Sequence, residues 1–248
     1  MKKIIVLPLL VALVLTGCSS QKNKNVTNNS ETGTTKTKEK SEESDASKGE
    51  SNKISGEITI DDLQFTEYSL EDDYATNYLV AVKNNSELTV GISANATAYS
   101  ADNNLLGAAS SEIDVLGPNE ESVLNFYFPS VSGIDHIDYK DNLQYATGTN
   151  LYYNPVISNL SVQDGLNGDV LTLAVTNNGD YAAEFVEAYA IFMDASGTPL
   201  QISSNYITDS NSEIAPGAMQ SAQIEYYSAY DKGEYDHVTY YFTGRAEK

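Results

Sequence analysis

The stretch YLVAVKNN at positions 78–85 is echoed by LTLAVTNN at positions 171–178. Each has the composition and alternation of a β-strand and ends in an Asn-Asn pair, which is typical of a turn. The segments that follow match in the same order, and the offset between them grows from 93 to 101 residues. The chain is therefore a duplicated domain with about 90 residues per copy, too long a period for a solenoid. The later matches are 96–104 with 188–197, 116–119 with 214–217, 124–127 with 224–227, and 135–139 with 236–240.

Each copy contains about seven short segments that alternate apolar and polar residues, separated by turn residues. The alternation is clear in residues 90–98 and again in residues 124–128, and no segment shows helical periodicity. This pattern predicts an all-β fold made of antiparallel sandwiches. A Cys-Trp-Cys immunoglobulin core is excluded because the chain has one Cys and no Trp. We therefore predict two tandem immunoglobulin-like antiparallel β-sandwiches, over residues 58–148 and 155–248.

The N-terminus has the features of an export signal. Lys2 and Lys3 precede an apolar run over residues 4–15, which is shorter than the roughly 20 residues needed to span a bilayer. The following Leu15-Thr16-Gly17-Cys18 resembles the lipobox of bacterial lipoproteins. That resemblance implies a lipoprotein signal peptide over residues 1–17, cleavage before Cys18 and lipid on its sulfur. The alternative is an ordinary secretory signal with an incidental Cys.

Residues 18–57 form a low-complexity segment. After Cys18 it carries seven Lys and seven acidic residues, many Ser, Thr and Asn, and no aromatic residue. Such a composition cannot bury enough apolar surface to offset chain entropy. We predict a disordered polar linker that tethers the folded part to the membrane through Cys18. This places the protein on the extracytoplasmic face of a cell membrane, as on a Gram-positive cell surface.

The charge is strongly negative. The chain has 14 Lys and Arg against 35 Asp and Glu, a net of −21, and residues 58–248 carry five basic residues against 28 acidic ones. An acidic excess of this size argues against a nucleic-acid partner, because phosphate binding needs clustered Lys and Arg. It favours cations or basic partners, although a solvated, soluble surface is the simpler explanation.

Several turns resemble those of the FxLYD-type immunoglobulin-like modules of bacterial surface lipoproteins. The second copy carries FMDASG at 192–197 and APG at 215–217, whereas the first departs, with ADNN at 101–104 and GPN at 117–119. The resemblance covers residues 58–248 and implies modules that are mostly non-catalytic.

A search for chemistry finds no Gly-x-Ser-x-Gly, His-Glu-x-x-His or phosphate-loop motif. His136 and His237 occupy equivalent places in the repeat, so duplication explains both. The DGLNGD stretch at 164–169 lacks the alternating oxygen ligands of a calcium loop, and 71–73 is a charge run without a cage. We therefore predict no enzyme, no cofactor and no metal. The chain is expected to be a binding or adhesion module for a protein or glycan; the alternatives are a passive envelope spacer or, third, a carboxylate-dependent hydrolase.

Two tyrosines are the candidate partner-binding residues. If the apolar residues of 224–227 and 238–242 point inward, alternation turns Tyr227 and Tyr241 outward. We predict that these two strands are neighbours, so that both rings lie on one exposed sheet face. Exposed Tyr is enriched where proteins bind partners, but ordinary cross-strand pairing is the alternative. Tyr152 and Tyr153, between the copies, are expected to pack between the two domains.

Overall fold

The computed structural model describes residues 3–4, 57–208, 213–227 and 233–248. Cys18, nearly all of the predicted signal peptide and the linker up to residue 56 lie outside these described residues. The described residues from 57 onward belong to one compact unit. Within the described part of the chain, no helix is long and apolar enough to cross a membrane.

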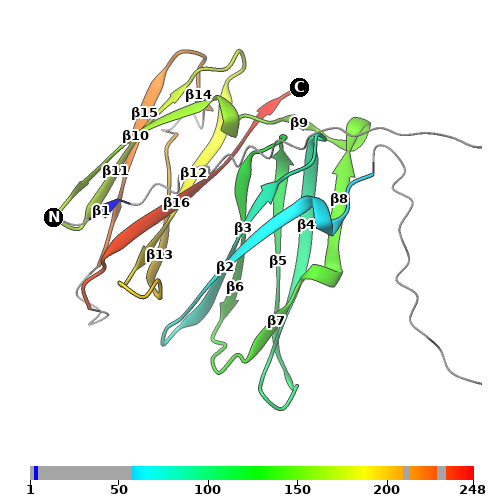
Figure 1. Ribbon diagram of the computed structural model, residues 1–248, viewed down its shortest axis with the longest axis vertical. Helices are drawn as coiled ribbons and strands as arrows, with labels where there is room; N and C mark the ends of the chain where they lie inside the picture. The colour runs from blue at the N-terminus through cyan, green and yellow to red at the C-terminus, as the bar shows by residue number, and fades with distance from the viewer. Residues whose placement is uncertain (1–2, 5–56, 209–212, 228–232) are drawn as a thin grey trace, which may run out of the picture. The chain divides into compact units, whose positions relative to one another are not determined.

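The first sandwich is built from strands β2 to β8 (cyan to green in Figure 1). One of its sheets has the order β2-β3-β6, and the other has the order β5-β4-β7, with β8 also paired to β4. Every pairing is antiparallel. The strands are β2 (Leu63–Glu71), β3 (Ala75–Asn84), β4 (Val90–Tyr99), β5 (Leu105–Leu116), β6 (Glu121–Pro129), β7 (His136–Asp138) and β8 (Leu143–Thr147), with short 3-10 turns η1 (Ile60–Asp62), η2 (Lys140–Asn142) and η3 (Gly148–Asn150).

The second sandwich repeats this arrangement. One sheet has the order β10-β11-β15, and the other is centred on β16-β12-β13. The prediction of an all-β chain with two tandem immunoglobulin-like sandwiches is thus confirmed. The strands are β9 (Tyr153–Asn154), β10 (Leu160–Asn167), β11 (Val170–Asn177), β12 (Ala183–Met193), β13 (Pro199–Tyr206), β14 (Glu213–Ile214), β15 (Met219–Glu225) and β16 (His237–Glu247), with the 3-10 turn η4 (Ile157–Asn159) and the two-residue β1 (Lys3–Ile4), which pairs in parallel with β16.

Each sandwich has its own apolar core, formed by the inward positions of the alternating strands. In the first, Val80, Phe126 and Phe128 are completely or almost completely buried. In the second, Leu173 holds the position that matches Val80, and Tyr226 holds the position that matches Phe126; both are completely or almost completely buried. Large apolar side chains of this kind each stabilise the fold by roughly 1.5–3 kcal/mol when fully buried.

The repeated asparagines explain why the two copies share their turns. Asn84 and Asn177 end β3 and β11 and are buried. The Nδ2 of Asn84 donates to the carbonyl oxygens of Leu88 (2.7 Å), Leu116 (3.2 Å) and Gly117 (3.1 Å). The Nδ2 of Asn177 likewise donates to two carbonyl oxygens, at 2.7 and 2.8 Å. Each amide thus connects the turn after its strand to the proline turn that precedes β6 or β15.

The first copy replaces glycine by asparagine where the backbone is left-handed. Asn119 (φ 62°) holds the place of Gly217 (φ 75°), and Asn103 (φ 57°) that of Gly197 (φ 86°). Asparagine tolerates positive φ better than other side-chain-bearing residues. The turns of the first copy that differ in sequence from those of the second therefore keep the same backbone conformation.

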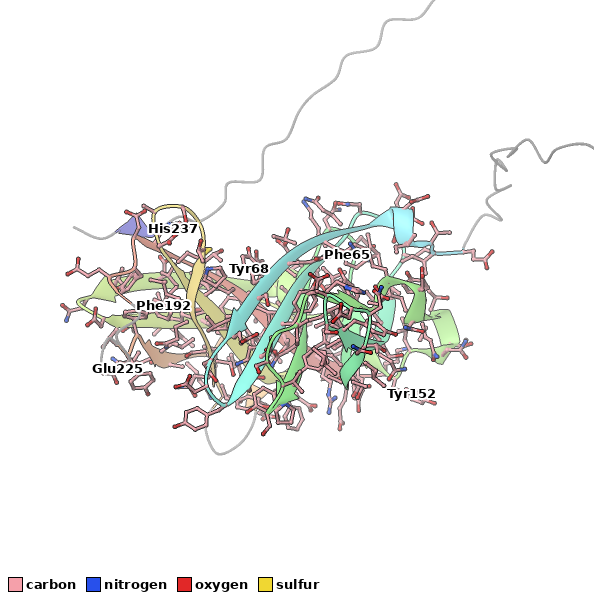
Figure 2. All side chains as sticks on the ribbon, turned by 90° about the horizontal axis from the view of Figure 1, so that it is seen from below. Phe65, Tyr68, Tyr152, Phe192, Glu225 and His237 are labelled. Atoms are coloured by element: carbon pink, nitrogen blue, oxygen red, sulfur yellow. The ribbon has the colours of Figure 1, made fainter. Side chains whose placement is uncertain are left out.

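The outward faces of two sheets, one from each sandwich, pack against each other. Leu79 and Ala81 of β3 form a buried cluster with Ile191 and Met193 of β12. Tyr68 and Tyr241 pack against this cluster, and their hydroxyl oxygens are 2.7 Å apart. Figure 2 shows Tyr68 on β2, the strand that also carries Phe65, which packs against the core of the first sandwich. The two sandwiches therefore form one apolar seam in addition to their separate cores.

This seam corrects one sequence prediction. Tyr241 lies on the face of β16 opposite Val238 and Phe242, as alternation predicts, but the first sandwich covers that face. Burial, followed by the hydrogen bond with Tyr68, raises the pKa of Tyr241 above its ordinary value. The prediction that the last two strands are neighbours is wrong, because β15 pairs with β11 and β16 pairs with β12. Tyr227 lies just beyond the end of β15.

An arginine clamp joins the sandwiches near the C-terminus. The guanidinium of Arg245 on β16 is paired with the carboxylate of Asp114 on β5. Its central carbon lies 4.1 Å from the ring centroid of Tyr153 and 4.8 Å from that of Phe185. Tyr153 thus packs as predicted at the junction, whereas Tyr152 is 82% exposed.

Candidate binding cleft

A cleft of about 490 Å³ lies between the β2–β3 hairpin of the first sandwich and β13 of the second. The hairpin contributes Glu71, Asp72, Asp73 and Tyr74, among others. The second sandwich contributes Tyr227 together with Gln201, Ile202 and Ser203. Tyr74 is 78% exposed and Tyr227 is 52% exposed. A volume of this size falls within the usual range of ligand sites.

The hairpin turn is held in place by Asp72. Its Oδ1 accepts the backbone N–H groups of Tyr74 (2.8 Å) and Ala75 (3.0 Å). This is the local side-chain-to-backbone bonding that makes Asp a preferred turn residue. Directly after β6, the N–H of Ser130 donates to the carbonyl oxygen of Tyr74 at 2.7 Å. Tyr74 is therefore displayed on an anchored backbone.

Gln201 does the same for Tyr227 on the opposite wall. The backbone N–H of Tyr227 donates to Oε1 of Gln201 at 2.8 Å. The Nε2 of Gln201 in turn donates to Oγ of Ser203 (2.7 Å) and to the carbonyl of Glu225 (2.8 Å). Gln201 is thus a positioning residue that ties the end of β15 to β13.

The described lining of the cleft carries three carboxylates and no Lys or Arg. The basic side chains that the structure describes beyond residue 57 lie elsewhere. Lys83 lies opposite Glu121, and Lys140 is 2.9 Å from Glu67. Arg245 is paired with Asp114, and Lys248 donates to a backbone carbonyl. The cleft is therefore acidic without a cationic group of its own among the described residues.

The structure brings one of the two predicted tyrosines, Tyr227, into this cleft and places Tyr241 in the seam. Cys18 lies outside the described residues. Sequence reasoning missed Tyr74, although a signal was present: it directly follows the acidic run 71–73 at a strand-to-strand turn. What the sequence did not indicate was that a second sandwich lies across from that turn.

A second polar cluster, on the first sandwich, is internally paired. Glu67 accepts hydrogen bonds from the hydroxyls of Tyr78 (2.6 Å) and Tyr139 (2.7 Å) and pairs with Lys140 at 2.9 Å. Burial raises the pKa of Glu67, but the bonds from Lys140, Tyr78 and Tyr139 lower it by more, so that it lies below the ordinary value of 4.5. These contacts favour the carboxylate and mark the cluster as structural.

The Glu67→Gln variant is expected to unfold with a weaker dependence on acid pH. Because the pKa of this carboxyl is lower in the folded chain than in the unfolded chain, the carboxylate stabilises the fold at pH values above the pKa of the unfolded chain. That contribution to the free energy of unfolding is lost as the pH falls through the pKa of the folded chain. Urea midpoints at a series of pH values from neutral to below 4.5 should therefore fall less steeply for the variant. Equal slopes for both proteins would show that the cluster contributes nothing to acid sensitivity.

Neither histidine nor the calcium-like stretch forms an evident metal site. Among the residues that the structure describes, no group of three or more His, Cys, Asp or Glu side chains is placed to hold a metal ion. His136 and His237 each lie beside the preceding Asp, with Nδ1 to Oδ2 distances of 3.1 and 3.3 Å. Asp164 accepts a hydrogen bond from the hydroxyl of Tyr240 at 3.2 Å.

Among known proteins, similarity to this chain is found in solved structures alone. No protein-family model matches the chain, and no curated protein matches it. Among solved structures, the chain is similar to the crystal structure of red sea bream transglutaminase, with a TM-score of 0.24 and 11% sequence identity. The match covers 76% of this chain and 29% of the transglutaminase chain.

Proposed function

We propose that this chain is a membrane-anchored extracellular lipoprotein whose tandem sandwiches act as a non-catalytic binding module. The observation that carries the proposal is the cleft between Tyr74 and Tyr227, which exposes two large aromatic side chains on fixed backbones. Exposed tyrosines favour binding because each combines a large apolar body with a polar tip. The resemblance of the turns to FxLYD-type modules supports the same class of function.

The non-catalytic part of the proposal rests on the resemblance to FxLYD-type modules, and two carboxylates of a second cavity are in keeping with it. A smaller cavity at the seam, about 270 Å³, is lined by Glu112, Asp114, Glu187 and Arg245, among others. Asp114 is paired with Arg245, and Glu187 accepts the hydroxyl of Tyr189 at 2.9 Å. Carboxylates engaged in this way hold the fold together, whereas general acid–base chemistry needs a carboxyl directed at a substrate.

The anchor is tested by replacing Cys18. Lipid on this sulfur is expected to hold the mature chain at the membrane, because each buried methylene adds roughly 0.8 kcal/mol of membrane affinity. The Cys18→Ser variant is therefore expected in the medium or as an unprocessed precursor. Fractionation of cells and medium, followed by mass determination of the chain, distinguishes these products. Mature variant that still partitions with membranes would contradict the anchor.

The binding role is tested with the full chain and its Tyr74→Ser, Tyr227→Ser double variant. Both proteins are applied to immobilised peptides of positive, negative and zero net charge and to cell-wall glycans. If the chain is a binding module, at least one of these probes should bind the wild-type chain and should not bind the variant. If the two proteins behave identically on every probe while both remain folded, the chain is better described as a passive spacer.

A further inference from the structure

We propose that Gln201 and Asn205 of β13 lock the outer edge of β15 and so prevent β15 from pairing with β15 of a second copy of the chain. This inference concerns the assembly state and does not depend on the proposed binding function. It rests on the position of β15 at the edge of its sheet, on the side chains that cover this edge, and on the same arrangement in the first sandwich.

Strand β15 lies at the edge of its sheet. It pairs with β11 along one side, and among the described residues no strand pairs with its other side. The carbonyl oxygens of Gln223 and Glu225, two residues apart, are directed to this outer side, toward β13. A strand edge of this kind presents N–H and C=O groups that can pair with a strand of another chain.

Two side-chain amides of β13 occupy these backbone groups. Nδ2 of Asn205 donates to the carbonyl oxygen of Gln223 at 2.9 Å, and Nε2 of Gln201 donates to that of Glu225 at 2.8 Å. Oε1 of Gln201 also accepts the backbone N–H of Tyr227 at 2.8 Å. Side chains therefore join the two sheets along this edge, and an incoming strand has to displace them before it can pair.

The first sandwich covers the matching edge strand with a different side chain. Strand β6 pairs with β3 and, within the described part of the chain, with no strand on its other side. Asn125 of β6 holds the place of Glu225 in the repeat. Its backbone N–H donates at 2.8 Å to Oγ of Ser111 on β5, a strand of the opposite sheet. Two copies with different sequences thus cover the same strand position, which indicates that coverage of the edge is the retained property.

A second copy of the chain is the partner that this edge fits. Residues 219–225 include one acidic residue, whereas residues 58–248 carry 28, so two copies meet along β15 with little charge at the contact. Two β15 strands related by a two-fold axis run antiparallel and form a closed dimer. Pairing centred on Gln223 places Glu225 opposite Ser221 of the other copy, so that like charges do not face each other.

The test measures the mass of the detergent-solubilised full chain by sedimentation equilibrium in density-matched detergent. The wild-type chain is expected to be a monomer. Gln201→Val with Asn205→Val is expected to form a dimer, with self-association at least about tenfold tighter, because neither copy has to break the amide hydrogen bonds first. Valine is a good strand former, so the sheet is retained. A wild-type dimer, or a monomeric double variant with native circular dichroism, would overturn the inference.

A matched control separates the open edge from a general gain in apolar surface. Asn95→Val with Gln144→Val replaces two exposed amides on β4 and β8 of the first sandwich. This control is expected to remain a monomer. If it associates as strongly as Gln201→Val with Asn205→Val, added apolar surface drives the association and the edge lock is refuted.

Gln223→Lys, added to the double variant, locates the interface. Lysine on an edge strand opposes strand addition, and two copies would bring these lysines face to face, so the chain is expected to return to a monomer. A dimer that persists would place the interface elsewhere and contradict the inference. If the double variant does not fold, Asn205→Val alone replaces it, because this change removes one bond of an exposed side chain. A weaker dimer is then expected, and a monomer would overturn the inference.

Discussion

The Asn177→Ala variant is expected to lose about 3 kcal/mol or more of unfolding free energy. The side chain is 1% exposed, and its Nδ2 donates to the carbonyl oxygens of Tyr181 (2.7 Å) and Ile214 (2.8 Å). Its Oδ1 accepts the N–H of Gly179 at 2.9 Å. Alanine leaves these groups buried without a partner, and each such group costs roughly 1–3 kcal/mol.

Asn84→Ala should behave in the same way in the first sandwich, where Oδ1 also accepts the N–H and the hydroxyl of Ser86. Urea denaturation followed by circular dichroism measures both losses. The neighbouring Asn178→Ala is the matched control, because its exposed side chain bonds only to surface groups of Asn159 and Ser161. If Asn177→Ala is as stable as Asn178→Ala, the buried amide does not hold the turns together.

The Arg245→Ala variant should lower the free energy of unfolding. Removing one partner of a buried ion pair usually costs about 3–5 kcal/mol, and solvent access to the pair reduces this cost. The side chains of Arg245 and Asp114 are 24% and 32% exposed, so we expect the lower end of this range. Arg245 also stacks on Tyr153 and Phe185, so packing is lost together with charge.

Arg245→Lys separates these contributions, because lysine keeps the charge but lacks the planar group that stacks between rings. We expect an intermediate loss of stability, measured by the same denaturation experiment. Hydrogen exchange should show the loss concentrated in β5, β9 and β16, where the clamp lies. If Arg245→Lys is as stable as the wild-type chain, the stacking of the guanidinium contributes nothing to stability.

The repeat predicted each sandwich because successive side chains of a strand point to opposite faces, so alternating apolar residues lie together on the inward face. It also predicted the proline turns at residues 116–119 and 214–217. The asparagines that replace glycine at positive φ, Asn103 and Asn119, show why the first copy could depart from its motif without changing its backbone.

The seam could not be read from a single strand, because an outward residue looks the same whether solvent or another sheet covers it. A signal nevertheless stood in the stretch at 78–85: it is apolar on both faces, and Leu79 and Ala81 on its outer face are fully buried. A strand buried on both faces reads as a continuous apolar run. The cleft depends on that packing, so it too was beyond sequence reasoning.

The packing of the two sandwiches into one unit is tested most directly by a double-mutant cycle on Tyr68 and Tyr241. Their hydroxyls are hydrogen-bonded at 2.7 Å and come from different sandwiches, 173 residues apart in sequence. Tyr68→Phe, Tyr241→Phe and the double variant each remove hydroxyls without changing ring packing. We predict a coupling free energy of about 0.5–1.5 kcal/mol in unfolding. Losses that simply add, with a coupling of zero, would contradict a seam between the sandwiches.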